Sequence, residues 1–222
     1  MVFALIPVKS IATAKSRLAA VLDAHERRTL VIAMFERVIS ECGACDRIDR
    51  ICVVTTDAEI TAIAHARGST VIAEHEDAGL NGGVSAGLDA ARSLGAERVL
   101  ILPADIPLID QSELRHILDA APGDSCSVIV PCHKGSGTNT LLIPACAGFK
   151  PQFGENSFRR HLRQLAALGL RPRILHLAGI AADIDEPADL DAFRARAASI
   201  WQFADPQAAQ PVERGEAPCR QN

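Results

Sequence analysis

Short apolar runs that alternate with helical patterns restrict this chain to a narrow set of folds. We expect strands that are buried on both faces, because three apolar runs are short and lack the polar alternation of a surface strand. These runs are residues 2–8, 50–55 and 70–73. Asp23 and Glu26 predict a capping box for the helix after the first run, and Asp57 predicts a cap for the helix after the second. This β-α-β-α-β order predicts a parallel sheet with helices on both faces.

The second half of the chain continues the alternation and then departs from it. The apolar run from Arg98 predicts the central strand, and residues 127–132 and 140–144 predict a hairpin that leaves the parallel order. The glycine-rich stretch up to Gly83 predicts a loop. The remaining expected elements are helices beyond Gly83, from Ser112, from Ser157 and from Pro187, and a last strand over residues 173–177. We therefore predict an α/β, three-layer, Rossmann-like fold with a mostly parallel central sheet.

Composition limits the domain count and the kinds of partner. A chain of 222 residues with 48% hydrophobic residues fits one domain over residues 1–203, and the Pro-, Gln- and Ala-rich residues 204–222 predict a disordered tail. A net charge of −4 gives no basic surface for nucleic acid or membranes. The odd count of seven cysteines favours reduced thiols, and neither a spanning segment nor a leader is evident, so we predict a cytoplasmic protein.

Acidic residues follow two of the predicted strands. Asp105 ends the most apolar run, at the sheet edge where α/β proteins bind ligands, and Asp183 and Asp185 follow the last strand. Paired carboxylates commonly hold magnesium against phosphates, so Asp105 and Asp183 are our candidate ligands. The competing interpretations are a turn-capping role for Asp105 and a helix-capping role for Asp185.

Cationic residues follow the first predicted strand. Lys9, Lys15 and Arg17 lie within nine positions and could neutralise a triphosphate, although a solvated loop explains them equally well. Neither a P-loop nor a G-x-G-x-x-G motif is present. If the chain binds a nucleotide, it must therefore do so by another arrangement.

Six motifs in order then resemble one known family. They are Ile6-Pro-Val-Lys9 with Ala14-Lys15-Ser-Arg17-Leu18, Leu80-Asn81, Pro103-Ala-Asp105-Ile-Pro107, Gly137-Thr-Asn-Thr140, Phe153-Gly154 with Ser157-Phe-Arg-Arg-His161, and Asp183-Ile-Asp185. Together they look like the phospholactate, phosphoenolpyruvate and 3-phosphoglycerate guanylyltransferase family of deazaflavin coenzyme F-420 biosynthesis. The resemblance implies a nucleotidyltransferase (GT-A-like) fold.

The resemblance also implies a reaction and roles for single residues. A small phosphorylated three-carbon acid attacks the α-phosphorus of GTP, and pyrophosphate leaves. Magnesium would be held by Asp105 and Asp183, and Thr140, Gly154 and Ser157 would contact the acceptor. With Lys9 and Lys15, the two acids complete our predicted catalytic set.

The residues themselves support parts of this assignment. Ser157 begins a helix, whose free N–H groups and positive dipole end favour an anion. For GTP we predict contacts from Lys9, Lys15, Arg17, Leu80 and Asn81, with a carboxylate among Glu74, Glu76 and Asp77 accepting from guanine. Arg159, Arg160 and His161 fit either a solvated face or direct contact. The acceptor phosphate is already anionic, so we nominate no catalytic histidine.

The sequence leaves other functions open. The alternatives are another nucleotidyltransferase of the same fold and a non-catalytic nucleotide-binding module. A homodimer is plausible, and the product would pass to the next enzyme of the coenzyme pathway.

Overall fold

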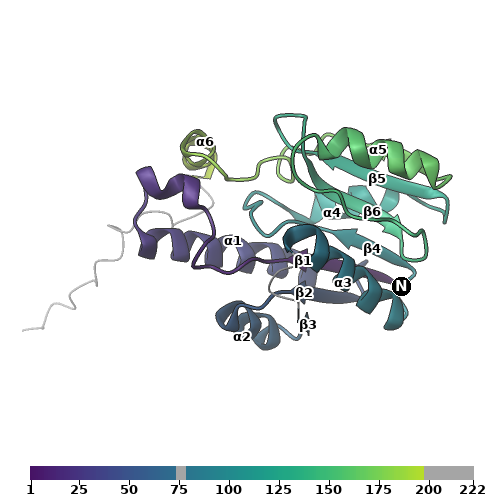
Figure 1. Ribbon diagram of the computed structural model, residues 1–222, viewed down its shortest axis with the longest axis horizontal. Helices are drawn as coiled ribbons and strands as arrows, with labels where there is room; N and C mark the ends of the chain where they lie inside the picture. Colours follow the sequence, from purple (N-terminus) through teal and green to yellow (C-terminus); the bar gives the residue numbers. More distant parts are fainter. Residues whose placement is uncertain (74–78, 198–222) are drawn as a thin grey trace, which may run out of the picture.

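The computed structural model describes residues 1–73 and 79–197, and one seven-stranded sheet runs through them (Figure 1). The strand order is β3-β2-β1-β4-β6-β5-β7. Only β6 among these strands runs opposite to its neighbours, because it pairs antiparallel with both β4 and β5. The strands are β1 Val2–Pro7, β2 Arg50–Val54, β3 Thr70–Ile72, β4 Arg98–Ile101, β5 Cys126–Pro131, β6 Thr138–Pro144 and β7 Arg171–Ile174.

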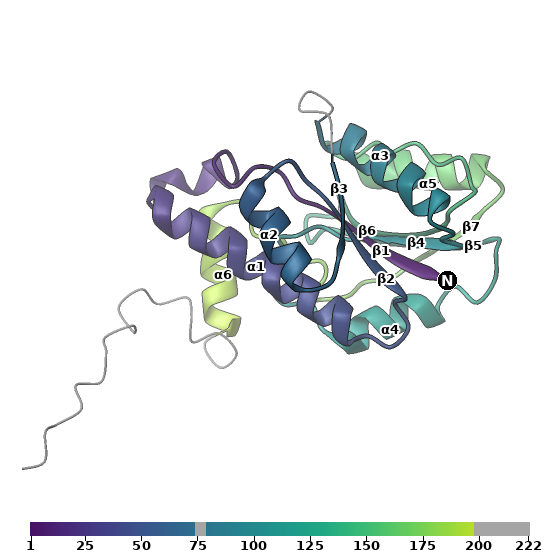
Figure 2. The same cartoon turned by 90° about the horizontal axis from the view of Figure 1, so that it is seen from below.

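Helices cover both faces of this sheet, as the alternating pattern predicted. Figure 2 shows α3 and α5 on one face, with α1, α2, α4 and α6 on the other. Two buried apolar clusters match this division, since Leu88 and Leu165 pack on the first face and Phe35 and Ile117 on the second. The helices are η1 Ser16–Ala20, a 3-10 helix, and α1 Ala24–Ala44, α2 Ala58–Ala66, α3 Gly79–Ser93, α4 Gln111–Asp119, α5 Ser157–Ala167 and α6 Pro187–Ala197.

Local sequence signals explain where several elements begin. Asp23 accepts from the backbone N–H of Glu26 while the Glu26 side chain accepts from Asp23, so the predicted capping box is present. Asp57 caps α2 through the backbone N–H groups of Glu59 and Ile60. The α/β class and the antiparallel hairpin of β5 and β6 are also confirmed.

Two boundaries differ from the sequence prediction. Helix α3 begins at Gly79, so Gly83 lies within the helix, and the predicted loop is wrong over residues 79–83. Packing decides the boundary, because Gly83, Val84 and Gly87 are buried against the sheet and this outweighs the low helix propensity of glycine. Strand β7 occupies Arg171–Ile174 rather than 173–177, where it pairs in parallel with β5 at the sheet edge.

Some predictions concern residues outside the described part of the chain. These are the disordered tail over 204–222 and the candidate guanine-reading carboxylates Glu74, Glu76 and Asp77. Within residues 1–73 and 79–197, no helix has the length and apolar character that a membrane span requires.

Candidate active site

Lys15 joins two carboxylates that come from distant parts of the chain. Its Nζ lies 2.5 Å from Oδ2 of Asp105, which follows β4, and 2.8 Å from Oδ1 of Asp185, which precedes α6. The Lys15 side chain is only 9% exposed and that of Asp105 27%, so water screens this contact weakly, whereas the Asp185 side chain is 44% exposed. Lys15 also has a left-handed backbone (φ 54°), which is uncommon for a non-glycine residue and is a form of strain that clusters at functional sites.

The charges around Asp105 do not balance. Burial raises the pKa of the Asp105 carboxyl; Lys15 opposes this rise, while the negative charges of Asp185 and Asp183 add to it. Burial alone would lower the pKa of Lys15, but Asp105 and Asp185 outweigh burial and raise it. Two carboxylates therefore share the Lys15 ammonium, with the Asp183 carboxylate nearby, and an additional cation would relieve the repulsion among these acids.

Asp183 is oriented by two neighbours at the same edge of the sheet. The Nδ2 group of Asn139 donates to Oδ1 of Asp183 at 3.0 Å and to the carbonyl oxygen of Ile180 at 2.8 Å. Nδ1 of His133 lies 3.5 Å from the same carboxylate oxygen. The segment that contains Asp183 passes beside Asp105, because the backbone N–H of Ile184 donates to the carbonyl oxygen of Asp105 at 3.2 Å.

The two predicted metal ligands are thus neighbours, although a complete metal cage is absent. Within the described residues, no group of three or more His, Cys, Asp or Glu side chains is arranged to hold a metal ion. Mg²⁺ usually takes one or two carboxylates and completes its shell with water and substrate phosphates. Asp105, with the crowded negative charge around it, fits that partial arrangement.

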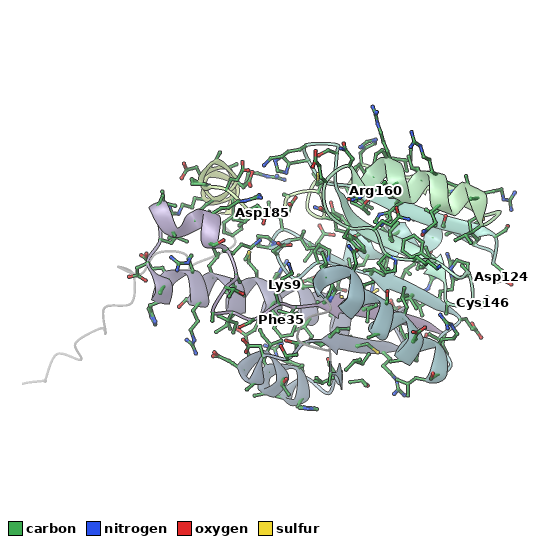
Figure 3. The ribbon with its side chains drawn as sticks, viewed as in Figure 1. Lys9, Phe35, Asp124, Cys146, Arg160 and Asp185 are labelled. Carbon is green, nitrogen blue, oxygen red and sulfur yellow. The ribbon has the colours of Figure 1, made fainter. Side chains whose placement is uncertain are left out.

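The predicted cationic loop lies next to these acids. Lys9 and Arg17 are exposed, and the Nη1 atom of Arg17 lies 3.9 Å from Oε1 of Glu186. Figure 3 shows Lys9, Asp185 and Arg160 toward one end of the sheet, with Asp124 and Cys146 at the other end. The cationic side chains and the acids therefore share the edge where the parallel strands end.

The predicted acceptor residues lie on β6 and at the start of α5. The hydroxyl of Thr140 is fully buried and has no hydrogen-bond partner within the described residues. Ser157 begins α5, as predicted, and its Oγ accepts from the backbone N–H of Thr138 at 3.0 Å. Gly154 has φ +111°, a conformation that side chains rarely adopt.

The start of α5 is less open than the sequence suggested. The backbone N–H of Ser157 donates to the carbonyl oxygen of Gly154 at 3.1 Å, and that of Phe158 donates to Ser136 at 3.1 Å. Two of the N–H groups that we expected an anion to use are therefore engaged within the protein.

Leu80 and Asn81 lie in the first turn of α3. The amide of Asn81 makes two contacts with the backbone of Phe153: Nδ2 donates to its carbonyl oxygen at 3.2 Å, and Oδ1 accepts from its N–H at 2.7 Å. An asparagine amide has a second hydrogen and a second lone pair, so it can still meet a nucleotide. The contact links α3 to the loop that carries Gly154.

Several residues at this edge were missed or misjudged from the sequence. Asp185 does not cap α6 through its side chain, since Asp189 accepts from the backbone N–H groups of Asp185 and Glu186. His161 is fully buried rather than part of a solvated face. Glu113 accepts from the backbone N–H groups of Gly179 and Ile180 and so fixes the segment before Asp183.

Comparisons with known proteins show what this chain is similar to. The family model described as "Guanylyl transferase CofC like" matches residues 2–194. The phosphoenolpyruvate guanylyltransferase of Sphaerobacter thermophilus is 37% identical over 188 residues, which cover 85% of this chain and 90% of that protein. The 3-phospho-D-glycerate guanylyltransferase of Phenylobacterium zucineum is 33% identical over 192 residues, with 85% and 88% coverage.

An archaeal relative and a solved structure extend the comparison. The 2-phospho-L-lactate guanylyltransferase of Methanothermobacter thermautotrophicus is 31% identical over 188 residues, with 84% of this chain and 81% of that protein covered. A nucleotidyl transferase structure from Methanothermobacter has a TM-score of 0.63 at 17% identity, covering 88% of this chain and 97% of that one. At that identity the likeness supports the fold alone.

Proposed function

The chain belongs to the CofC-like guanylyl transferase family, and from that premise we propose that it transfers GMP from GTP to a small phosphorylated three-carbon acid. Its relatives are named for phosphoenolpyruvate, 3-phospho-D-glycerate and 2-phospho-L-lactate, which are all acids of this class. The product is a guanosine diphosphate-linked acid, and we assign it to coenzyme F-420 biosynthesis.

The contact of the buried Lys15 ammonium with Asp105 and Asp185 supports this proposal. Nucleotidyl transfer needs positive charge concentrated near the phosphates of GTP, because these phosphates are anionic in the ground state and during the reaction. Lys15 brings a buried cation to the point where two chain segments place carboxylates. A structural ion pair would need only one of these acids.

In the proposed complex the cationic loop holds the triphosphate. Lys9 and Arg17 can turn toward phosphate oxygens, since both are exposed and the contact of Arg17 with Glu186 is long, at 3.9 Å. Lys15 would neutralise charge nearest the acids. Leu80 and Asn81, at the start of α3, contact the base or ribose.

The acids would hold a magnesium ion against the phosphates. We assign this role to Asp105 and Asp183, because Ile184, the residue after Asp183, donates its backbone N–H to the carbonyl oxygen of Asp105 at 3.2 Å and so brings the two segments together. When bound, the ion neutralises phosphate charge and polarises the α-phosphorus. Asn139 and His133 hold the Asp183 side chain in place before the substrates arrive.

The acceptor would lie against Thr140, Gly154 and Ser157. A phosphate oxygen of the acid forms a bond to the α-phosphorus of GTP. The bond between that phosphorus and the bridging oxygen breaks, and its electron pair leaves with pyrophosphate. The attacking oxygen carries no proton near neutral pH, so the residues need only position it. A polar acceptor group would also satisfy the buried hydroxyl of Thr140.

Pyrophosphate release tests this function directly. The protein is incubated with Mg²⁺, one of four nucleoside triphosphates and one of the three acids, and we expect turnover only with GTP. Asp105→Asn should abolish turnover, whereas Asp124→Asn, an exposed change at the other end of the sheet, should not affect it. Failure of all three acids, or full activity of Asp105→Asn, would refute the proposal.

A further inference from the structure

The buried imidazole of His161 joins three segments around the proposed acceptor site. His161 lies in α5 and is 0% exposed. Its Nε2 accepts from the backbone N–H of Gln152 at 3.0 Å, and its Nδ1 lies 3.0 Å from Oγ1 of Thr138. A backbone N–H can only donate, so Nε2 is unprotonated and Nδ1 carries the hydrogen that Thr138 accepts.

Aromatic rings fix the orientation of this imidazole. The ring centroids of Phe149 and Phe153 lie 5.2 and 4.8 Å from that of His161, and both interplanar angles are steep. Burial lowers the pKa of His161 to about 4, with a smaller contribution from the charge of Arg160, so the ring is neutral at physiological pH. The neutral form is the one that the two hydrogen bonds require.

The same loop, residues 149–156, is held from its other side by Asn81. The Asn81 amide contacts both the N–H and the carbonyl oxygen of Phe153. Gly154 therefore follows a residue whose backbone is fixed by α3, and whose ring packs on His161. Ser157 is linked to His161 through Thr138, because the Oγ of Ser157 accepts from the backbone N–H of Thr138 and the Oγ1 of Thr138 contacts the His161 ring.

We propose that His161 and Asn81 are positioning residues for the acceptor, His161 acting through Gln152 and Thr138 and Asn81 acting through Phe153. This inference rests on the proposed function. Together they hold the loop that carries Gly154, and the start of α5 that carries Ser157, against β6 and α3. Asn81 also couples α3, on the nucleotide side, to the acceptor side.

Packing alone does not account for a histidine here. A leucine would fill much of the same space without the cost of burying two polar ring atoms. Both hydrogen bonds of His161 lead to segments that adjoin Gly154 or Ser157. The polar contacts therefore serve this loop in particular.

Steady-state kinetics of three α5 variants tests the inference. His161→Leu removes both hydrogen bonds, His161→Gln keeps one donor and one acceptor, and Leu165→Ala opens the apolar core on the same face of the helix. We expect His161→Leu to raise the KM for the acceptor at least tenfold with the KM for GTP within twofold. His161→Gln should restore most of this loss, and Leu165→Ala should lower Tm without changing the KM for the acceptor.

The outcomes separate this inference from the function on which it rests. If the wild-type protein turns over no acid with GTP, the proposed function is refuted and the inference with it. If the wild type is active but His161→Leu keeps its KM for the acceptor, only the inference is refuted. It is refuted as well if Leu165→Ala raises that KM as much as His161→Leu does, because helix stability alone would then explain the effect.

Asn81→Leu provides a second test that does not disturb the core, since Asn81 is exposed. Loss of the two hydrogen bonds between the Asn81 side chain and the Phe153 backbone should speed hydrogen exchange at the backbone N–H of Phe153 and raise the KM for the acceptor. Unchanged exchange at Phe153 together with an unchanged KM for the acceptor would refute the role of Asn81.

Discussion

The neutral, buried His161 should make the stability of the protein depend on pH in a defined window. Its pKa is about 4 in the folded protein, against 6.5 for an unperturbed histidine. Because the folded-state value is lowered, the unfolded chain binds the proton first as pH falls. The contribution of neutral His161 to the free energy of unfolding is therefore present above pH 6.5 and is lost as the pH falls toward 4.

The size of this effect follows from the two pKa values. Each unit of difference corresponds to about 1.4 kcal/mol, so the full loss is about 3 kcal/mol. Between pH 7 and pH 5 the same linkage gives a loss of about 2 kcal/mol. This range avoids most of the titration of exposed carboxylates.

Urea unfolding followed by far-ultraviolet circular dichroism measures this loss. The free energy of unfolding is determined at pH 7 and pH 5 for the wild type and for His161→Gln, which has no titrating ring. All other groups titrate in both proteins, so they cancel in the comparison. We expect the wild type to lose about 2 kcal/mol more than the variant. Equal losses in the two proteins would refute a buried neutral imidazole at this position.

Three further perturbations probe the site and the fold. Removal of divalent metal with EDTA should stop pyrophosphate release, and added Mg²⁺ should restore it; activity that survives chelation would refute the role of Asp105 in holding a metal. Gly87→Ala places a Cβ 2.5 Å from Cδ1 of Leu5 and 2.8 Å from Cγ2 of Val54, so overpacking of about 1–3 kcal/mol should exceed the roughly 1 kcal/mol gained in helix propensity and lower Tm. Glu113→Ala leaves two backbone N–H groups without their acceptor, so unfolding by urea should show a loss of about 1–3 kcal/mol, and turnover should fall as the segment before the catalytic acids loosens. Unchanged stability in either variant would contradict the packing or hydrogen bonding at that position.

Local patterns in the sequence were sufficient for most of the fold. Strands buried on both faces appear as short apolar runs, and the carboxyl groups of Asp23 and Asp57 mark helix starts, because caps depend on neighbours within three residues. The placement of Asp105 beyond the carboxyl end of β4, which ends at Ile101, follows from the same local reasoning.

Contacts between distant segments could not be predicted in this way. Lys15 is 90 residues from Asp105 and 170 from Asp185, so their pairing depends on how β1, β4 and α6 come together. A signal for the burial of His161 was present, because it stands three residues after Phe158 and four before Leu165 on the apolar stripe of α5. Because histidine is polar, the sequence pattern did not place His161 among the buried residues of this stripe.

The reversed strand β6 separates the parallel strands β3, β2, β1 and β4 from the strands β5 and β7. Strands β1 to β4 are all parallel and lead into the loops that we propose to bind GTP, whereas Thr138 and Thr140 enter the same edge from the beginning of a strand that runs the other way. A bulge between β5 and β6 interrupts their register at this point. We expect that exchange of the segment from β5 through the start of α5 between relatives named for different acids transfers acceptor preference. The use of GTP should stay unchanged, because the parallel strands β1 to β4 and their loops are not exchanged.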